Sequence, residues 1–320
     1  MRPKQVLNRM IGRRNIRVKV MQALYTLATT GVTTPEEQKE KGSELLDDKI
    51  SRFLDLFVIS VLYTVRIAQY AEKDAGKRAS KYLPTDDDLN VSTKIAGNEF
   101  LWKILNNETF VEKIKDKEVS RYIDEDQVRR IYKKFADTPE YKKYISTRER
   151  DYKSELAIIK YIWDEQLYGD ETAMEHFTDE LPGWEDDMEM VKILMDNFFK
   201  SSSKVNFLKL ISAEKNEYAH SLLHTTVDKE EYCVELIQPK LVNWDSERVA
   251  LIDLLLLRMG VSELLYFPTI PTKVTINEYI EIAKLYSTPQ SGQFVNGVLD
   301  NILKDLTKAD KIHKEQRNSK

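Results

Sequence analysis

The sequence is poor in the residues that crosslink a fold or interrupt its helices. Among 320 residues there is one cysteine, Cys233, with only ten glycines and nine prolines. A single cysteine excludes an intramolecular disulfide and a cysteine-based zinc site, so packing has to hold the fold together. Because turn formers are scarce while Leu, Ile, Lys and Glu recur, the composition favours an all-α fold. A chain of this length can bury a sizeable core.

Long apolar runs are also missing. A membrane-spanning helix needs roughly 18 or more consecutive apolar residues. The best candidate, LDLFVISVLYTV at residues 54–65, is shorter and has charges at or next to its ends, Asp55 and Arg66. The N-terminus lacks the apolar core of a secretory signal. We therefore expect no membrane span and a cytoplasmic location.

Acidic residues are absent from the first 35 positions, although the whole chain carries a net charge of −4. This segment holds seven cations, namely Arg2, Lys4, Arg9, Arg13, Arg14, Arg17 and Lys19. The rest of the chain therefore carries about −11, which is −4 less 7. A basic arm on an acidic body can dock on a polyanion while the body is repelled elsewhere. The charge distribution thus favours nucleic-acid binding even though the total charge does not.

Hydrophobic spacing predicts helices along most of the chain and no sheet. We predict a helix over 12–29, a linker over 31–42 and a long helix over about 43–74. Further helices are predicted over 92–106, 109–116, 125–135, 138–146, 149–167, 171–178, 185–200, 204–211, 214–226, 228–241, 243–267 (opening at an Asp245 cap) and 274–286. We expect Thr288 to cap a last helix with Pro289 in its first position. The polar tail after Lys308 is expected to fray.

The last predicted helix contains the stretch SGQFVNGVLD at 291–300, which includes three poor helix formers. Gly292, Asn296 and Gly297 lie within two turns, and each glycine costs roughly 1 kcal/mol relative to alanine. Either close packing or a bound partner should offset that cost. Phe294, on the apolar stripe of the same helix, is open to two interpretations, a core residue or a platform for an unpaired base.

Three segments from the two ends of the chain share a recognisable pattern. They read RRNIRVKVMQALYTL at 13–27, LIQPKLVNWDSERVALIDLLLLRMGVSELL at 236–265 and IPTKVTINEYIEIAKLYSTPQSGQFVNGVLD at 270–300. The specific part is Arg258 followed by Glu263 and then by INE, AK and FVNGVLD in that order. In this combination the chain resembles the NusB family of transcription antitermination factors.

The resemblance implies a compact, all-helical bundle that is much shorter than this chain. We therefore predict that residues 1–35 and 213–308 form a NusB-like RNA-binding core and that 36–212 form one large helical insertion after the first helix. Residues 309–320 are predicted to be a polar tail. The family's role implies a transcription regulator that pairs with the ribosomal protein NusE and binds boxA, a short single-stranded RNA element. The complex would join RNA polymerase and suppress termination, chiefly in ribosomal RNA operons.

The resemblance also assigns residues to an RNA surface, which are Arg13, Arg14, Arg17, Arg258, Gln293, Phe294 and Asn296. Guanidinium groups bind phosphate bidentately and stack on bases, and an aromatic ring can stack a base for about 1–3 kcal/mol. Two positions depart from the family pattern, because Asn15 and Gln293 stand where arginine and lysine are frequent. Structural alternatives remain open: a core phenylalanine, an asparagine cap, and an internal salt bridge for Glu263.

Two residues match positions that the family turns toward NusE, Tyr25 and Asp253. An acidic group that faces a basic ribosomal protein is electrostatically favourable. The alternative is a surface acid and a core tyrosine. The central hypothesis is that the cationic segment at Arg13 and the aromatic segment at Phe294 fold side by side into one groove for an unpaired strand.

Other functions have weaker support. HSLLH places His220 and His224 at the i, i+4 spacing of a helical metal pair, but no nearby acid completes a zincin motif, so no metal site is expected. The acids of DELPGWEDDMEM at 179–190 are better interpreted as a solvated loop and helix start than as a hydrolase centre. Since the chain also lacks a phosphate-binding glycine loop and a nucleophile elbow, we expect no enzyme and no cofactor.

Two related classes of protein also have to be weighed. A NusB-like module opens certain ribosomal RNA methyltransferases, but this chain ends about twenty residues after FVNGVLD, with no room for their nucleotide-binding domain. A protein-interaction module that has lost RNA binding is the alternative that Asn15 and Gln293 favour.

Overall fold

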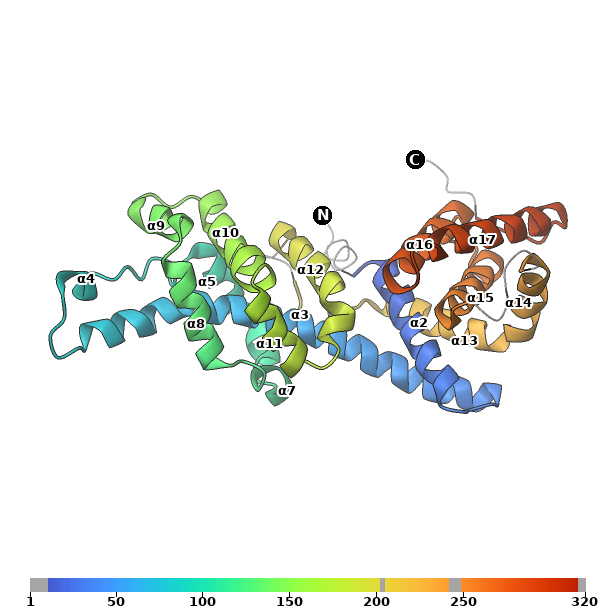
Figure 1. The fold of residues 1–320 in the computed structure, drawn as a ribbon, viewed down its shortest axis with the longest axis horizontal. Helices are drawn as coiled ribbons and strands as arrows, with labels where there is room; N and C mark the ends of the chain where they lie inside the picture. Colours follow the sequence, from blue (N-terminus) through green and yellow to red (C-terminus); the bar gives the residue numbers. More distant parts are fainter. Residues whose placement is uncertain (1–10, 202–204, 242–248, 316–320) are drawn as a thin grey trace. The chain divides into compact units, whose positions relative to one another are not determined.

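The computed structural model describes residues 11–201, 205–241 and 249–315, and in these ranges it contains helices and no strand (Figure 1). The predicted all-α fold is confirmed. No helix within the described ranges is both long and apolar enough to cross a bilayer. The chain divides into two compact units. We call the described residues of Gly12–Ile50 and Ser212–Lys320 the terminal unit, and the described residues of Ser51–Ile211 the middle unit.

The terminal unit is built around one apolar helix, α15 (Leu251–Tyr266). Four helices contact α15 from different sides, namely α2 (Arg13–Thr29), α13 (Ala213–Asp228), α14 (Glu230–Ile237) and α16 (Thr272–Tyr286), and α17 (Ser291–Lys308) also packs on it. A short 3₁₀ turn, η3 (Gln238–Lys240), follows α14. Since α15 is buried almost all round, its sequence is apolar on every face.

Gly260 lets α15 and α17 approach closely. A Cβ atom at this position would lie 3.0 Å from both Leu299 methyl groups and 3.4 Å from Cδ2 of Tyr279. Only a residue without a side chain fits this contact without displacing its neighbours. The glycine therefore fixes how the two helices that carry the family motifs pack together.

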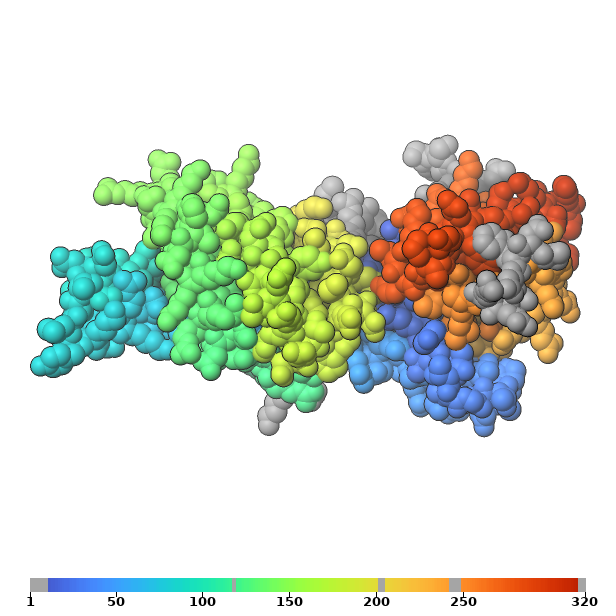
Figure 2. Space-filling model, viewed as in Figure 1, coloured from blue at the N-terminus to red at the C-terminus, as the bar shows by residue number. Residues whose placement is uncertain are grey.

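The middle unit surrounds the later part of α3 (Pro35–Ala79), whose earlier part, residues 35–50, belongs to the terminal unit. Its other helices are α4 (Asp86–Leu89), α5 (Glu99–Leu105), α6 (Glu108–Lys113), α7 (Lys117–Ser120), α8 (Glu125–Ala136), α9 (Pro139–Ser146), α10 (Tyr152–Tyr161), the π-helix η1 (Ile162–Tyr168), α11 (Glu171–Glu180) and α12 (Trp184–Ser201). In Figure 2 the green to yellow side chains of α8–α12 cover most of the visible face of this unit.

Aromatic rings fill the core of the middle unit. Phe57 on α3 lies 5.8 Å from Phe198 on α12 and stacks at 6.1 Å on Phe207, measured between ring centroids. Farther along α3, Tyr63 contacts Phe177 on α11 at 4.8 Å. Large buried rings of this kind dominate core energetics, so the middle unit has a hydrophobic core of its own.

Several predicted elements were wrong. The linker over 31–42 is helical from Pro35 on, because Pro35 and two glutamates follow Thr34, whose hydroxyl accepts a hydrogen bond from Glu37 N at 3.4 Å. Residues 92–98 and 205–211 are not helical. The last helix begins at Ser291 with Gln290 as N-cap, so Thr288 and Pro289 precede it. The predicted Asp245 cap lies outside the described residues.

The tail was predicted to fray, and over 311–315 this prediction was wrong. Lys314 Nζ donates hydrogen bonds to the carbonyl oxygens of Glu263 at 2.9 Å and Phe267 at 2.8 Å, at the carboxyl end of α15. The backbone N–H of Glu315 donates to Pro268 O at 3.0 Å. The last carbonyls of a helix have few partners within the helix, and the Lys314 amine supplies donors to two of the carbonyls at this end. The tail therefore completes the end of the central helix.

Candidate nucleic-acid interface

The three predicted RNA-binding arginines of α2 each pair with a glutamate from another helix of the terminal unit. Arg13 Nη2 lies 3.2 Å from Glu214 on α13. Arg14 forms a bidentate pair with Glu278 on α16, at 2.9 and 3.0 Å. Arg17 forms a bidentate pair with Glu263 on α15, at 2.8 and 2.7 Å. The basic surface expected at these three positions is therefore partly neutralised from within the fold.

The Arg17–Glu263 pair lies in the core, since the two side chains are 1% and 0% exposed. The Glu263 carboxylate also accepts hydrogen bonds from the hydroxyls of Tyr218 (2.7 Å), Thr275 (2.7 Å) and Tyr279 (3.3 Å). Burial raises the pKa of Glu263, but the bonds from Arg17 outweigh burial and leave that pKa below its usual value. The carboxylate is thus ionised and hydrogen-bonded at both oxygens, and Arg17 has almost no surface to offer RNA.

Asn15, which departs from the family's arginine, has a local role. Its side-chain oxygen accepts a hydrogen bond from Gly12 N at 2.9 Å, and the residue is buried. The bond satisfies one of the backbone donors that the start of a helix leaves unpaired. Asn15 therefore fixes the beginning of α2, immediately beside the two arginines that do reach the surface.

Of the three arginines of α2, Arg13 and Arg14 are the two that reach the surface, with side chains 37% and 41% exposed. The Arg13 guanidinium lies 5.6 Å from the centre of the Tyr218 ring. The hydrogen bonds to Glu278 raise the pKa of Arg14. The Arg13–Glu214 pair is exposed, and such pairs contribute only about 0–1 kcal/mol. The bidentate Arg14–Glu278 pair is half-buried, and Glu278 also lies 3.6 Å from Arg17, so this glutamate is held more firmly.

The first turns of α17 separate into a buried and an exposed side. Phe294 is 3% exposed and belongs to the core. Gln293, Asn296 and Gly297 are exposed together, as the helical spacing i, i+3, i+4 requires. The Phe294 ring therefore has no free face for a base in this structure, whereas Gln293 and Asn296 can reach a ligand.

The two glycines of this helix differ in how much room surrounds them. A Cβ on Gly292 would lie 2.9 Å from Cγ of Lys284 on α16, so close packing explains that glycine. A Cβ on Gly297 would meet no described heavy atom within 4 Å. Packing within the fold does not account for Gly297, and it leaves bare helix backbone beside Asn296.

Helix α16 connects the two candidate segments. Arg14 pairs with Glu278 of α16, and Gly292 packs against Lys284 near the other end of the same helix. Between them lies Glu281, which pairs with Lys284 at 2.7 Å and also acts electrostatically on Arg14. The two candidate segments thus both contact α16, Arg14 at Glu278 and Gly292 at Lys284.

The remaining predicted residues lie on α15 and α2. Arg258 pairs with Glu230 at 2.9 Å and is 16% exposed. Asp253, expected at a partner surface, is 5% exposed and accepts a hydrogen bond from Ser291 Oγ at 2.7 Å, which anchors the start of α17. Tyr25, the other expected partner contact, is 43% exposed. Of these residues, Tyr25 has the largest exposed surface.

Sequence reasoning missed the acids that neutralise the arginines. Glu278 is the acid of the INE motif, and Glu214 opens α13. Hydrophobic spacing can be recognised within a single segment of sequence, but it does not show which distant residues will pair. Glu214 and Glu278 lie 201 and 264 residues from their partners Arg13 and Arg14. The motif INE was a signal that an acid mattered there, without indicating its partner.

Comparisons with known proteins decide the family. The model of the NusB family matches residues 187–304. A transcription antitermination protein NusB from Salinibacter ruber is 46% identical over 101 residues, 32% of this chain and 63% of that protein. Its counterpart from Fervidobacterium nodosum is 39% identical over 105 residues, 32% of this chain and 70% of that protein. The chain belongs to the NusB family.

The relationship to other NusB proteins covers a limited part of the chain. A NusB protein of Listeria monocytogenes is 39% identical over 93 residues, which are 29% of this chain and 73% of that protein. The chain spans less than two thirds of the length of the Salinibacter relative. The family model begins within α12 and does not include α2. No solved structure matches the chain.

Proposed function

We propose that this NusB-family protein is a non-enzymatic, cytoplasmic transcription antitermination factor that binds boxA-like single-stranded RNA together with the ribosomal protein NusE. The observation that carries the proposal is the 39–46% identity to relatives named transcription antitermination proteins. In this proposal the terminal unit is the RNA-binding core, the middle unit is an insertion within it, and the complex joins RNA polymerase.

The RNA surface that we propose is narrower than the set of residues inferred from the sequence. It keeps the exposed members of that set, which are Arg13 and Arg14 on α2 with Gln293 and Asn296 on α17. Gly297, exposed beside Asn296, is added to them. Phosphates would replace Glu214 and Glu278 as partners of the two arginines. Tyr25 is the residue best placed to contact NusE, because it is exposed on α2.

The test is an RNA titration of the full-length chain with the double variant Arg13→Gln/Arg14→Gln. Glutamine is preferable to glutamate, which would place like charges against Glu214 and Glu278. If both arginines bind phosphate, the slope of log affinity against log salt should fall by about 1.4, because each single-strand phosphate contact contributes about 0.7. Affinity at low salt should fall at least about tenfold.

A matched control removes two cations from the opposite end of α17. Lys304→Gln/Lys308→Gln changes the net charge equally, and both residues are exposed. It should retain the wild-type salt slope. An unchanged slope in the Arg13/Arg14 variant, with its fold intact, would rule out the proposed surface.

The second candidate is a protein-interaction module without RNA affinity. The pairing of Arg13, Arg14 and Arg17 with glutamates favours it, since all three arginines of α2 already have an acidic partner. Titrating boxA RNA with and without NusE separates the two. Binding of NusE with no RNA affinity in either mixture would select this second function.

A further inference from the structure

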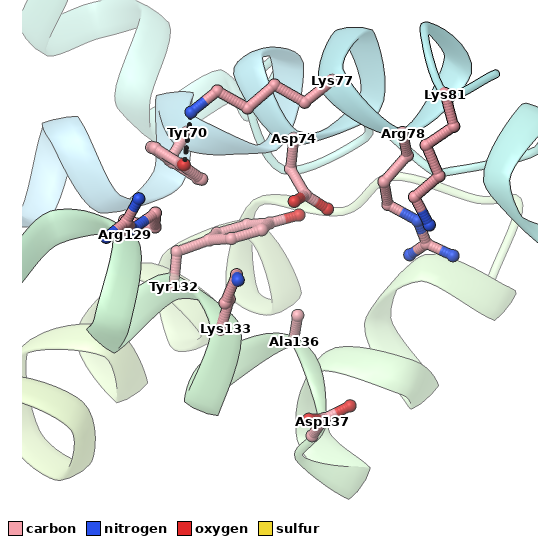
Figure 3. A pocket seen from close by; sticks show the side chains of 10 residues that line it. All are labelled: Tyr70, Asp74, Lys77, Arg78, Lys81, Arg129, Tyr132, Lys133, Ala136 and Asp137. Atoms are coloured by element: carbon pink, nitrogen blue, oxygen red, sulfur yellow. Dashed lines mark hydrogen bonds between the residues drawn. The ribbon is translucent and has the colours of Figure 1, made fainter. Parts of the chain in front are cut away.

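A cavity in the middle unit collects cations from two helices. It lies between the last turns of α3 and helix α8 and has a volume of about 480 Å³ (Figure 3). Lys77, Arg78 and Lys81 line it from the α3 side, and Arg129 and Lys133 line it from α8. Cavities of about 300–1,000 Å³ are typical of small-molecule and cofactor sites.

The charges lining this cavity do not balance. Against five cations stand two lining carboxylates, Asp74 and Asp137, which gives a net charge of +3. Yet residues 51–211 as a whole contain more acids than bases. Like charges that converge on one cavity repel one another, so an anion between them would be stabilised.

Some of these cations are already used by the fold. Arg78 and Lys81 both bind the Asp88 carboxylate, at 2.9 and 2.8 Å, and the bonds from Lys81 and Arg78 hold the pKa of Asp88 well below its usual value. This contact fastens α4 to the end of α3. Cations near the end of a helix also offset its dipole. Neither the bonds to Asp88 nor the dipole of α3 explains why Arg129 and Lys133 of α8 line the same cavity.

The other cations are less committed. Arg129 makes an exposed i, i+3 pair with Asp126 at 3.1 Å, and Lys77 donates a hydrogen bond to the Tyr70 hydroxyl at 3.2 Å. Lys133 makes no hydrogen bond or ion pair with any residue that the structure describes. Exposed pairs of this kind exchange readily, so three cations from both walls are available to a ligand.

Two buried tyrosines form a rigid, uncharged wall of the cavity. Tyr70 and Tyr132 are 4% and 1% exposed, and their ring centroids lie 5.2 Å apart. Burial raises the pKa of Tyr132, so its hydroxyl stays neutral. Figure 3 shows Asp74 on the same side as the Tyr132 hydroxyl. The two rings are too deeply buried to offer a face to a base, so the groups that can hold a ligand here are the cations of the rim.

We propose that this cavity binds a ligand with at least two consecutive phosphate groups, held between the cations of α3 and those of α8. Cations on both walls suit consecutive phosphates better than one. The same chemistry occurs in a free nucleoside polyphosphate and in adjacent phosphates of an RNA strand. The site lies wholly within residues 70–137 and does not depend on the proposed boxA surface.

The first experiment uses inorganic tripolyphosphate as the probe, in calorimetric titrations of the full-length chain. The variant Arg129→Gln/Lys133→Gln should weaken binding at least about tenfold, because it removes both cations of one wall. The control Lys142→Gln/Lys143→Gln removes two exposed cations from α9, outside the cavity, and should bind as the wild type does. Thermal unfolding of both variants checks that the fold is retained.

Competition then identifies the source of the phosphates. Displacement of tripolyphosphate by ATP but not by a ten-nucleotide RNA indicates a free nucleotide, and displacement by the RNA indicates a strand. Adenosine without phosphates should displace nothing. The variant Arg13→Gln/Arg14→Gln should bind tripolyphosphate normally, which separates this site from the proposed function. No saturation below about 1 mM, or equal binding by the Arg129/Lys133 variant and its control, overturns the proposal.

Discussion

Replacing Arg17 by methionine separates a structural from an RNA-binding role for this residue. The substitution keeps the aliphatic stem and leaves the fully buried Glu263 carboxylate with the hydroxyls of Tyr218, Thr275 and Tyr279. Removing one partner of a buried ion pair costs about 3–5 kcal/mol. Because three hydroxyl donors remain, we expect the lower end, about 3 kcal/mol in the free energy of unfolding.

Urea unfolding of the full-length chain measures this loss. With an m-value near 3 kcal/mol per M, the transition midpoint should fall by about 1 M. The double variant Arg17→Met/Glu263→Gln removes the uncompensated charge and should recover at least about 1 kcal/mol. At a urea-free condition where the single variant is folded, its affinity for boxA RNA should stay within about twofold of wild type.

The pH dependence of the unfolding free energy provides a second test of the Arg17→Met variant. In the wild type the pKa of Glu263 is lowered, so the stability from this pair is present above the unfolded pKa of about 4.3 and is lost as pH falls. Without Arg17, burial alone should raise that pKa, and the variant should become more stable as pH falls from 7 to 5. The structural role would be refuted if the Arg17→Met variant had wild-type stability and lost RNA affinity, and if its stability did not rise as pH falls from 7 to 5.

Three further outcomes follow from the packing of the terminal unit. Gly260→Ala should lower the free energy of unfolding by about 1–3 kcal/mol, since its methyl would press on Leu299; differential scanning calorimetry measures the loss. Gly297→Ala should instead stabilise α17 by up to about 1 kcal/mol, and weaker RNA or NusE binding in that variant would show that a partner approaches there. Burial lowers the pKa of Lys314 to about 8, so the docked tail should gain stability as pH rises through 8 to 10; slower amide exchange at the end of α15, corrected for intrinsic rate, checks this.

Periodicity predicted the helices whose apolar stripe faces a core, such as α8 and α16, to within about two residues at each end. It failed at 35–42, where the glycine at the end of the predicted linker looked like a helix breaker. In the structure a Cβ on Gly42 would lie 2.8 Å from Cδ1 of Leu27 and 3.1 Å from Leu223 Cδ2. That glycine permits close helix packing, and only the positions of distant residues could distinguish the two causes.

The partners of charged residues in the candidate site could not be predicted from the sequence either. The sequence indicated that Glu263, on an apolar helix, needs a partner, but several cations could have supplied it. Arg17 is that partner from 246 residues away. The sequence also left two roles open for Phe294. Its place on an apolar helical stripe predicted a core residue, whereas the family motif suggested that it stacks on a base. Its 3% exposure favours the core.

The arginines at the start of α2 differ in burial: Arg17 is buried, whereas Arg13 and Arg14 are partly exposed. Arg17 and Arg13 lie on the same side, four residues apart, but Arg17 reaches the core while Arg13 reaches the surface. A buried pair is costly to break, whereas the exposed Arg13–Glu214 pair is worth about 0–1 kcal/mol. The half-buried, bidentate Arg14–Glu278 pair is intermediate between the two. In the proposed function, RNA therefore competes for Arg13 and Arg14 but not for Arg17. If Arg13→Gln and Arg14→Gln weaken RNA binding while Arg17→Met weakens only the fold, the buried arginine positions the helix and its two neighbours bind the strand.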